Sequence, residues 1–360
     1  MTVSEHRGGG RKPAPLALRA CHPEGLSGPE GSPLSLRCGV VIWGALVVGA
    51  LALTPAPVAA QSDNGLPVQQ QSNLLATARS PLYFQPRVPA HSGTRITVAF
   101  DYASIYELAL DAVGDPYVQD LELATVHLAA TRDLSPTAYV TADLPVGTAW
   151  KGGLDGFLGW WHEVLSIELP ERSLRPEHRF GYRLELPNGD SVHYAPTSYL
   201  GDLRVGTGWR FAPGGQLMAT VTLPTATAEG YGKDVVSFGA ILTGTTDLDS
   251  RLRVEGSVAL GYTPRTDAVL RPYQRSTFGA VGGGFRWRFF RGASMFGTLW
   301  LHSPYYAHTG MRSLDRNELT FDFGWIVRTK EGAEWRVGMA EDPNPSGPGV
   351  DAVFKASRSW

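Results

Sequence analysis

The feature that most constrains the fold of this chain is a two-residue alternation of apolar and polar side chains through residues 201–360. In residues 317–328, Leu319 and Phe321 alternate with Glu318 and Asp322. Successive side chains of a strand point to opposite faces, so each such segment has one apolar and one polar face. The same alternation recurs in residues 201–211, 250–262, 276–290 and 334–339. The pattern predicts a series of amphipathic strands.

The connections between these segments alternate in length. Residues 247–249 and 291–292 make tight turns, whereas residues 263–275, 303–316 and 341–349 make long connections. Short turns at one end and long loops at the other are typical of outer-membrane barrels. After residue 60 no apolar run is long enough for a spanning helix. The other structure that can pair all its backbone N–H and C=O groups within a bilayer is a closed barrel.

The alternative fold is a soluble β-sandwich or periplasmic barrel, which would turn the apolar faces inward. Only 18% of the residues are charged and 42 are glycine, which suits twisted strands that face an apolar medium. Aromatic residues near the strand ends favour the membrane, where such residues form girdles. The interfacial aromatics expected here are Trp160, Trp161, Trp209, Trp325, Trp335 and Trp360.

The N-terminal region carries an export signal. Residues 38–53 are uncharged and largely apolar, follow Arg37 and lead to a small-residue stretch that ends at Ala60 before the polar Gln61. This order predicts a signal peptide over residues 38–60 with cleavage between Ala60 and Gln61. A membrane-anchor helix is the alternative. Residues 1–37 are interpreted as a disordered leader or a mis-called start.

Both cysteines, Cys21 and Cys38, precede the predicted cut. The exported part therefore contains no thiol, which excludes disulfides and cysteine chemistry there. The net charge of −2 gives no reason to expect a nucleic-acid partner. The histidines show no metal-ligand spacing, so we expect no metal and no cofactor.

The part before residue 200 is less regular. Residues 61–93 have no clear period and are expected to form an irregular periplasmic or plug segment, with the barrel over residues 94–360. Alternation in 94–102 and 137–144 indicates strands, and residues 118–131 are expected to pair with the latter. The predicted fold is an all-β, transmembrane antiparallel barrel of about 12 strands, within a range of 10–14.

Residues 152–167 break the two-residue period. Leu154, Phe157, Leu158, Trp161 and Leu165 follow helical spacing. We expect one short amphipathic helix in a loop, resting on the bilayer surface or the barrel rim. A hairpin is expected to follow at residues 179–195.

The last strand resembles the assembly signal of bacterial outer-membrane proteins. Ala352, Phe354 and Ala356 share one face with the terminal Trp360, while Arg358 lies on the same, lipid-facing side. The expected partners are therefore outer-membrane lipid and the barrel-assembly machinery. The expected location is the cell outer membrane.

Several segments taken together resemble a known family. They are residues 143–146, 153–157, 161–162, 199–206, 303–306 and 339–342. As a set they resemble the bacterial family catalogued as domain of unknown function 3187, over roughly residues 65–360. The resemblance implies an outer-membrane barrel distantly similar to porin-like transporters, and it supplies no catalytic residues. The family's usual ending is altered at residues 348–354.

The polar faces of the strands collect arginines and acids that would line the lumen. The predicted charge ladder consists of Arg204, Arg210, Arg251, Arg253, Glu255, Arg286, Arg288, Glu318, Asp322, Arg328 and Arg336. One interpretation is structural, with paired charges filling a narrow lumen. The other is an arginine-rich constriction that favours anionic or amphiphilic solutes.

The predicted function is a passive channel or transporter for small solutes, without enzyme activity. The alternatives are a closed structural or assembly barrel and, less favoured, a membrane-embedded lipid hydrolase. The hydrolase would use a loop that contains His302, Ser303, His308 and Asp315.

Overall fold

The computed structural model describes residues 74–83, 93–109, 117–165, 179–186, 188–212, 214–266, 269–342 and 352–360 of the chain. The predicted leader, signal peptide and cleavage site at Ala60 and Gln61 lie outside the described residues. Within these described ranges, no helix is both long and apolar enough to cross a membrane.

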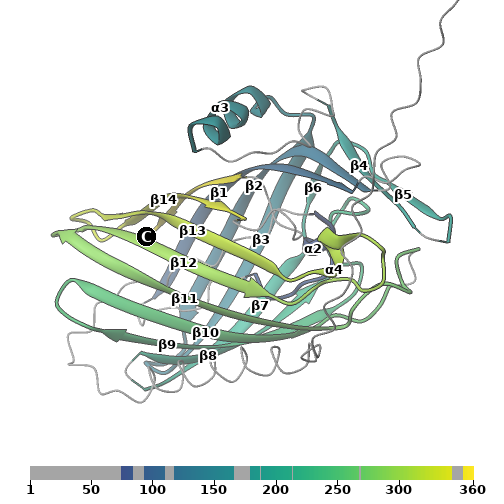
Figure 1. Cartoon of the computed structure of the whole chain (residues 1–360). Helices are drawn as coiled ribbons and strands as arrows, with labels where there is room; N and C mark the ends of the chain where they lie inside the picture. Colours follow the sequence, from purple (N-terminus) through teal and green to yellow (C-terminus); the bar gives the residue numbers. More distant parts are fainter. Residues whose placement is uncertain are drawn as a thin grey trace, which may run out of the picture.

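Twelve antiparallel strands form a closed ring (Figure 1). They are β1 (Thr94–Ala109), β2 (Tyr117–Asp133), β3 (Ala138–Trp150), β7 (Leu203–Ala212), β8 (Gly215–Leu223), β9 (Ser237–Asp247), β10 (Leu252–Tyr262), β11 (Thr277–Phe290), β12 (Ala293–His302), β13 (Glu318–Arg328), β14 (Glu334–Glu341) and β15 (Ala352–Ser359). Each strand of the ring pairs with the next, and β15 pairs with β1 to close it. The predicted barrel of about 12 strands is confirmed.

Three shorter strands extend the wall at one end. β4 (Gly181–Glu185) pairs with the first residues of β2 and with β5 (Ser191–His193), and β6 (Thr197–Leu200) pairs with the last residues of β3. The hairpin expected at residues 179–195 is therefore present. It projects from the ring beside β2 (Figure 1).

The two ends of the barrel differ. The end that we call the short-turn end holds the tight turns after β2, β7, β9, β11 and β13, together with the chain terminus. The opposite, long-loop end holds the connections that contain α3 (Asp155–Leu165) and α4 (Arg312–Asp315). The start of β1 and the end of β15 meet at the short-turn end, where the hydroxyls of Thr97 and Ser359 are 2.8 Å apart.

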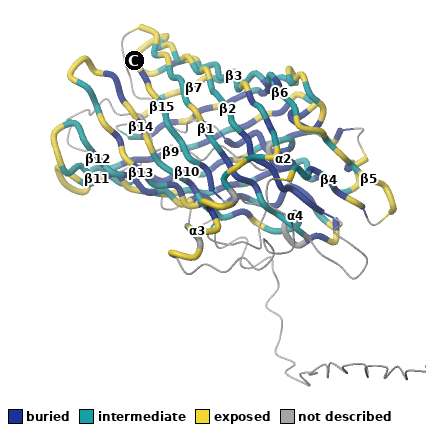
Figure 2. The backbone as a smooth tube through the Cα atoms, turned by 90° about the horizontal axis from the view of Figure 1, so that it is seen from above, coloured by how far each residue is buried: buried dark blue, intermediate teal, exposed yellow. Residues whose placement is uncertain are grey.

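The strands turn their apolar faces outward. In β13, Glu318, Thr320 and Asp322 are buried, whereas Phe321 and Trp325 are exposed. Burial alternates in a similar way along much of β8, β9 and β14 (Figure 2). A soluble sandwich would show the reverse. The wall therefore presents apolar side chains outward and polar side chains to the lumen.

Inside the barrel, large rings lie against glycines at paired positions of neighbouring strands. These pairs are Tyr139 on Gly208, Tyr199 on Gly147 and Trp300 on Gly282. A Cβ atom at any of these glycines would collide with the ring opposite. Gly282 of β11 therefore marks a close approach between neighbouring strands.

Candidate functional site in the barrel lumen

A ring of arginines lines the lumen near the short-turn end. The arginine ring consists of Arg95, Arg210, Arg253, Arg286, Arg288, Arg328 and Arg336, which occupy inward positions of β1, β7, β10, β11, β13 and β14. Three acids lie among them: Asp133, Asp247 and Glu334. A fourth acid of the predicted ladder, Glu255, is buried at the next inward position of β10 beyond Arg253. Seven guanidinium groups thus outnumber four carboxylates, so this part of the lumen is positively charged.

Each acid of the ring is held by at least one arginine. Arg210 Nη2 lies 2.8 Å from Asp133 Oδ1, and Arg253 Nε lies 2.7 Å from Asp247 Oδ1. Charge-assisted contacts of this length are among the stronger hydrogen bonds in proteins. They fix the long arginine side chains against the wall.

Glu334 is the most heavily shared of these acids. Arg328 and Arg336 donate to its two oxygens over 2.9 and 2.8 Å, and a nitrogen of Arg286 lies 4.0 Å away. The carboxylate is almost fully buried. One acid thus links three arginines from three strands.

Halfway up the barrel, ionisable side chains from several strands lie close to one another. Lys355 of β15 donates to Asp322 of β13 over 2.6 Å and is paired in register with Asp101 of β1. On the other side of Asp101, Asp143 of β3 contacts both His127 and Arg204, at 3.3 and 3.8 Å. We call this set, Asp322, Lys355, Asp101, His127, Asp143 and Arg204, the charge belt.

The wall formed by β8 to β10 has largely uncharged residues in its middle, with Glu255 as a buried acid. It carries Thr220, Ile241 and Ser257, all buried on β8 to β10. Among the described residues, Oδ2 of Asp101 and Oδ1 of Asp322 are buried without a hydrogen-bond partner. The belt therefore leaves acceptor capacity facing the lumen.

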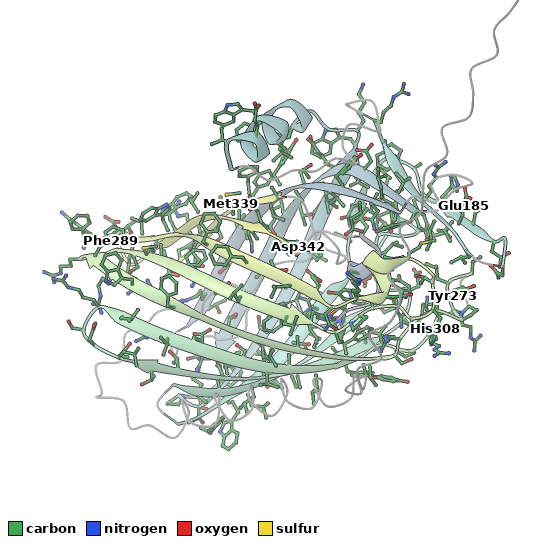
Figure 3. All side chains as sticks on the ribbon, in the orientation of Figure 1. Glu185, Tyr273, Phe289, His308, Met339 and Asp342 are labelled. Atoms are coloured by element: carbon green, nitrogen blue, oxygen red, sulfur yellow. The ribbon has the colours of Figure 1, made fainter. Side chains whose placement is uncertain are left out.

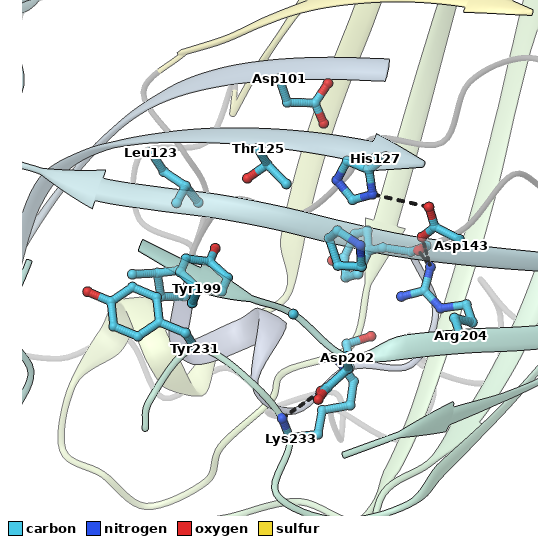
Figure 4. A pocket seen from close by; sticks show the side chains of 15 residues that line it. Asp101, Leu123, Thr125, His127, Asp143, Tyr199, Asp202, Arg204, Tyr231 and Lys233 are labelled. Atoms are coloured by element: carbon cyan, nitrogen blue, oxygen red, sulfur yellow. Dashed lines mark hydrogen bonds and ion pairs between the residues drawn. The ribbon is translucent and has the colours of Figure 1, made fainter. Parts of the chain in front are cut away.

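A cavity of about 70 Å³ lies beside the charge belt (Figure 4). Its lining includes Asp101, His127 and Arg204 of the belt together with Tyr199 and Lys233. A cavity of this size, with charged side chains in its wall, has room for a few water molecules.

Residues 74–83, which we call the lumen segment, cross the barrel above this cavity at the long-loop end. The segment begins with α2 (Leu74–Thr77). Its contacts reach strands all round the ring: Leu74 N–H to Gln119 of β2, Arg204 of β7 to the Tyr83 carbonyl, Ser80 to His302 of β12 and Tyr83 to Glu318 of β13. A segment that touches inward side chains of facing walls lies across the lumen.

Arg79 fastens the lumen segment to the loop between β10 and β11. Its guanidinium group is buried and donates to the carbonyl oxygens of Thr263, Pro264 and Arg275 over 3.1, 3.1 and 2.8 Å. In return, the Thr263 hydroxyl donates to the Arg79 carbonyl over 2.7 Å. These four bonds tie the segment to the long-loop end.

A second attachment is made by stacked rings. His302 stacks between Tyr83 and Tyr305, with centroid distances of 5.5 and 4.4 Å. Both tyrosine hydroxyls donate to Glu318. Burial raises the pKa of Tyr83 and of Tyr305 well above the ordinary value, so the two hydroxyls remain protonated donors.

The residues considered for hydrolase chemistry are used differently. His302 contacts Ser80 and the carbonyl of Ser303. The Ser303 hydroxyl accepts from the Gly279 N–H, and Asp315 accepts from the Thr309 N–H. In the described part of the chain, these hydrogen bonds thus do not join His302, Ser303 and Asp315 into a nucleophile–base–orienter set.

The structure places most of the predicted ladder at inward positions, with two exceptions in role. Arg251 is exposed in the turn before β10, where Asp249 Oδ1 accepts from the N–H groups of Arg251 and Leu252; its place in the lumen stays a prediction. Glu318 lies at the opposite end from the arginine ring, against the lumen segment.

Sequence reasoning missed the charges of β1 to β3 and the individual contacts of residues 74–83, for which a plug was one of the two expectations. The signal for Asp101 was present, because it alternates with Phe100 and Tyr102 on β1. Residues 74–83 gave no such signal, since they follow neither a helical nor a strand period.

The expected interfacial aromatics lie on the outer surface. Trp209, Trp325, Trp335 and Trp360 are exposed near the short-turn end, and Trp160 is exposed on α3; the side chain of Trp161 lies outside the described residues.

Neighbouring side chains complete the aromatic surface at the short-turn end. The ring of Phe289 packs edge-on against Trp325 at 5.4 Å (Figure 3). The Arg358 guanidinium lies 5.1 and 5.3 Å from the rings of Trp335 and Trp360, so its charge is placed at the barrel end and in contact with aromatic faces.

In the part of the chain that the structure describes, no group of three or more His, Cys, Asp or Glu side chains could hold a metal ion.

The ring of twelve strands, its apolar outer wall and its charged lumen define an outer-membrane β-barrel. A family model described as "Protein of unknown function (DUF3187)" matches residues 42–344, and the chain belongs to this family. The resemblance drawn from the sequence is confirmed.

Solved structures with the same fold include several outer-membrane barrels. The COG4313 outer membrane channel from Pseudomonas putida F1 matches at 11% identity with a TM-score of 0.50, covering 75% of this chain and 96% of that one. The translocator domain of autotransporter NalP from Neisseria meningitidis matches at 10% identity, 75% and 89% coverage and a TM-score of 0.42. The NanC porin matches at 7% identity, 74% and 98% coverage and a TM-score of 0.43. A search of curated proteins finds no match.

Proposed function

We propose that this protein is a passive channel of the outer membrane for small solutes, that it favours anionic or amphiphilic ones, and that it performs no catalysis. The observation that carries the proposal is the arginine ring, in which seven arginines outnumber the four acids among and beside them. Rings of one charge in a narrow pore attract solutes of the opposite charge and repel the others. Uncharged side chains on β8 and β9, such as those of Thr220 and Ile241, suit a solute with an apolar side.

In this proposal the lumen segment closes the channel at the long-loop end. Arg79 supplies three of the hydrogen bonds that hold the segment, so the Arg79→Ala variant should release it. We expect the full chain to conduct rarely in planar bilayers and the variant to be open for a much larger fraction of the time. In a salt gradient, the open channel should pass chloride in preference to potassium.

The matched control is Arg265→Ala, since Arg265 lies in the same loop region but is exposed. Equal open fractions for the two variants would contradict the closing role of the lumen segment. A preference for potassium in the open channel would contradict the role of the arginine ring.

A closed structural barrel is the second candidate, and the lumen segment itself favours it. The test uses the purified double variant Arg79→Ala, Tyr83→Phe. If this variant is correctly folded but shows neither conductance nor solute flux into liposomes, the structural barrel is established over the channel.

We also infer that the protein reaches the outer membrane by export, with cleavage between Ala60 and Gln61, and that the assembly machinery recognises the strand ending at Trp360. N-terminal sequencing of the protein from an outer-membrane fraction tests the cut. Deletion of Trp360 should reduce the folded protein in that fraction, and an undiminished amount would contradict the recognition.

A further inference from the structure

Helix α3 lies outside the barrel instead of over its mouth (Figure 1). It belongs to the long connection after β3. The ring of Phe157 contacts that of Phe354 at 6.1 Å, and Phe354 is an outward residue of β15. The helix therefore packs against the surface that the barrel presents to lipid.

A carboxylate on the outer wall fixes the start of this helix. Glu122 of β2 alternates with Leu123 and Thr125, which line the lumen cavity, so Glu122 points outward. It is nevertheless only 2% exposed. It accepts the N–H of Gly153 over 2.6 Å, the N–H of Leu154, and the hydroxyl of Tyr102.

These hydrogen bonds stabilise the Glu122 carboxylate on the outer wall, where an unpaired charge would destabilise the barrel. An unpaired carboxylate on the lipid face destabilises a barrel, whereas the N–H groups at the start of a helix favour a negative charge. Gly152 precedes the helix with φ +71°, and a Cβ atom there would collide with the Glu122 carboxyl. The contact between chain and carboxylate is therefore close and requires glycine.

The helix leaves an apolar face uncovered. Phe157, Trp160 and Val164 are 43%, 55% and 57% exposed and are three and four residues apart, which places them on neighbouring positions of one face. Leu158 is fully buried. Glu163 is exposed as well, on a different side of the helix from Val164.

We propose that α3 is an in-plane membrane helix whose Phe157, Trp160 and Val164 face contacts the acyl chains of the leaflet at the long-loop end, with Glu122 holding it in place. The occupant is lipid because the exposed face continues the outer wall of the barrel through Phe354. Helices with one apolar face and aromatic residues lie in the interface in this way. This inference is independent of whether the lumen conducts.

Site-directed spin labels test the orientation of the helix. In a chain with Cys21→Ser and Cys38→Ser, a nitroxide is placed at Val164→Cys or at the adjacent Glu163→Cys, and the protein is reconstituted in phosphatidylcholine vesicles. We expect the label at 164 to collide readily with oxygen and poorly with a water-soluble nickel complex, and the label at 163 to show the reverse. Equal nickel accessibility at both positions would overturn the proposal.

The role of Glu122 is tested with Glu122→Leu, which suits lipid but cannot accept hydrogen bonds. Its effect is compared with that of Glu185→Gln, which changes an exposed carboxylate of β4 (Figure 3). In the Val164→Cys background, Glu122→Leu should increase label mobility and raise nickel accessibility severalfold, with no change for Glu185→Gln. Heat-modifiable gel migration verifies that the barrel is folded. A folded Glu122→Leu protein with unchanged spectra would overturn the holding role.

Discussion

Glu334 shows how a single residue balances the arginine ring, because it is the shared partner of Arg328 and Arg336 and lies 4.0 Å from Arg286. Removing one partner of a buried charge cluster costs more than the net stability of the cluster, because the remaining charges stay buried and unbalanced. The carboxylate is therefore important even though the ring as a whole has an excess of arginine.

Glu334→Gln should lower the free energy of unfolding in detergent by about 3 kcal/mol. Urea unfolding followed by tryptophan fluorescence measures this change. Glu331→Gln, in the exposed turn before β14, is the control and should be neutral. Equal unfolding midpoints for the two variants would show that Glu334 does not balance the ring.

At the scale of elements, the connection between β8 and β9 contributes a buried amine to the lumen cavity. Lys233 is 3% exposed, and its backbone N–H donates to Asp202 over 2.7 Å. Burial lowers the pKa of Lys233 to about 8, which the nearby Arg204 and Arg79 reinforce and Asp202 opposes.

The sign of the pH effect follows from this lowered pKa. Between pH 8 and the ordinary value of 10.5 the unfolded chain binds more protons at Lys233 than the folded protein does, so the free energy of unfolding should rise with pH across this window. From pH 7 to 9.5 we expect a contribution of about 2 kcal/mol that Lys233→Met removes. Lys330→Met, at an exposed turn position, should keep the rise. Identical pH profiles for the two variants would contradict the assignment.

The elements differ in how far the sequence predicts them. In β13 and β14 the two-residue period identifies both faces, because every second side chain must suit lipid. The lumen segment has no such period, since Arg79 binds backbone carbonyls and Tyr83 binds one distant carboxylate. Contacts between residues so far apart in sequence leave no local pattern. Helix α3 was predictable from its spacing, but its contact with Glu122 was not.

At the scale of the whole molecule, the barrel was predictable because strands with one apolar face cannot leave an edge unpaired in a bilayer. The charged character of the lumen was predictable, whereas the positions and contacts of its individual residues were less so. The alternation does not reveal where a strand ends and a turn begins, as at Arg251, which precedes β10. The charge belt could not be predicted, because it requires the register between β15, β1 and β3.

A closed ring without free edges should resist detergent. We expect the folded protein to migrate on a gel in dodecyl sulfate differently before and after boiling, and to need detergent for solubility. Circular dichroism of the β type should be lost only on heating. A monomer that remains in solution without detergent would contradict the membrane barrel.

The position of residues 74–83 also has a consequence for the order of events during biogenesis. β1 follows these residues in the chain and closes the ring by pairing with β15, which brings together residues as distant as Thr97 and Ser359. If closure comes last, the wall assembles around a segment that is already docked. If closure comes first, the segment must be drawn into a finished cylinder. Contacts of such large sequence separation form slowly, so the tethered N-terminal residues can act as an internal template for the wall that surrounds them.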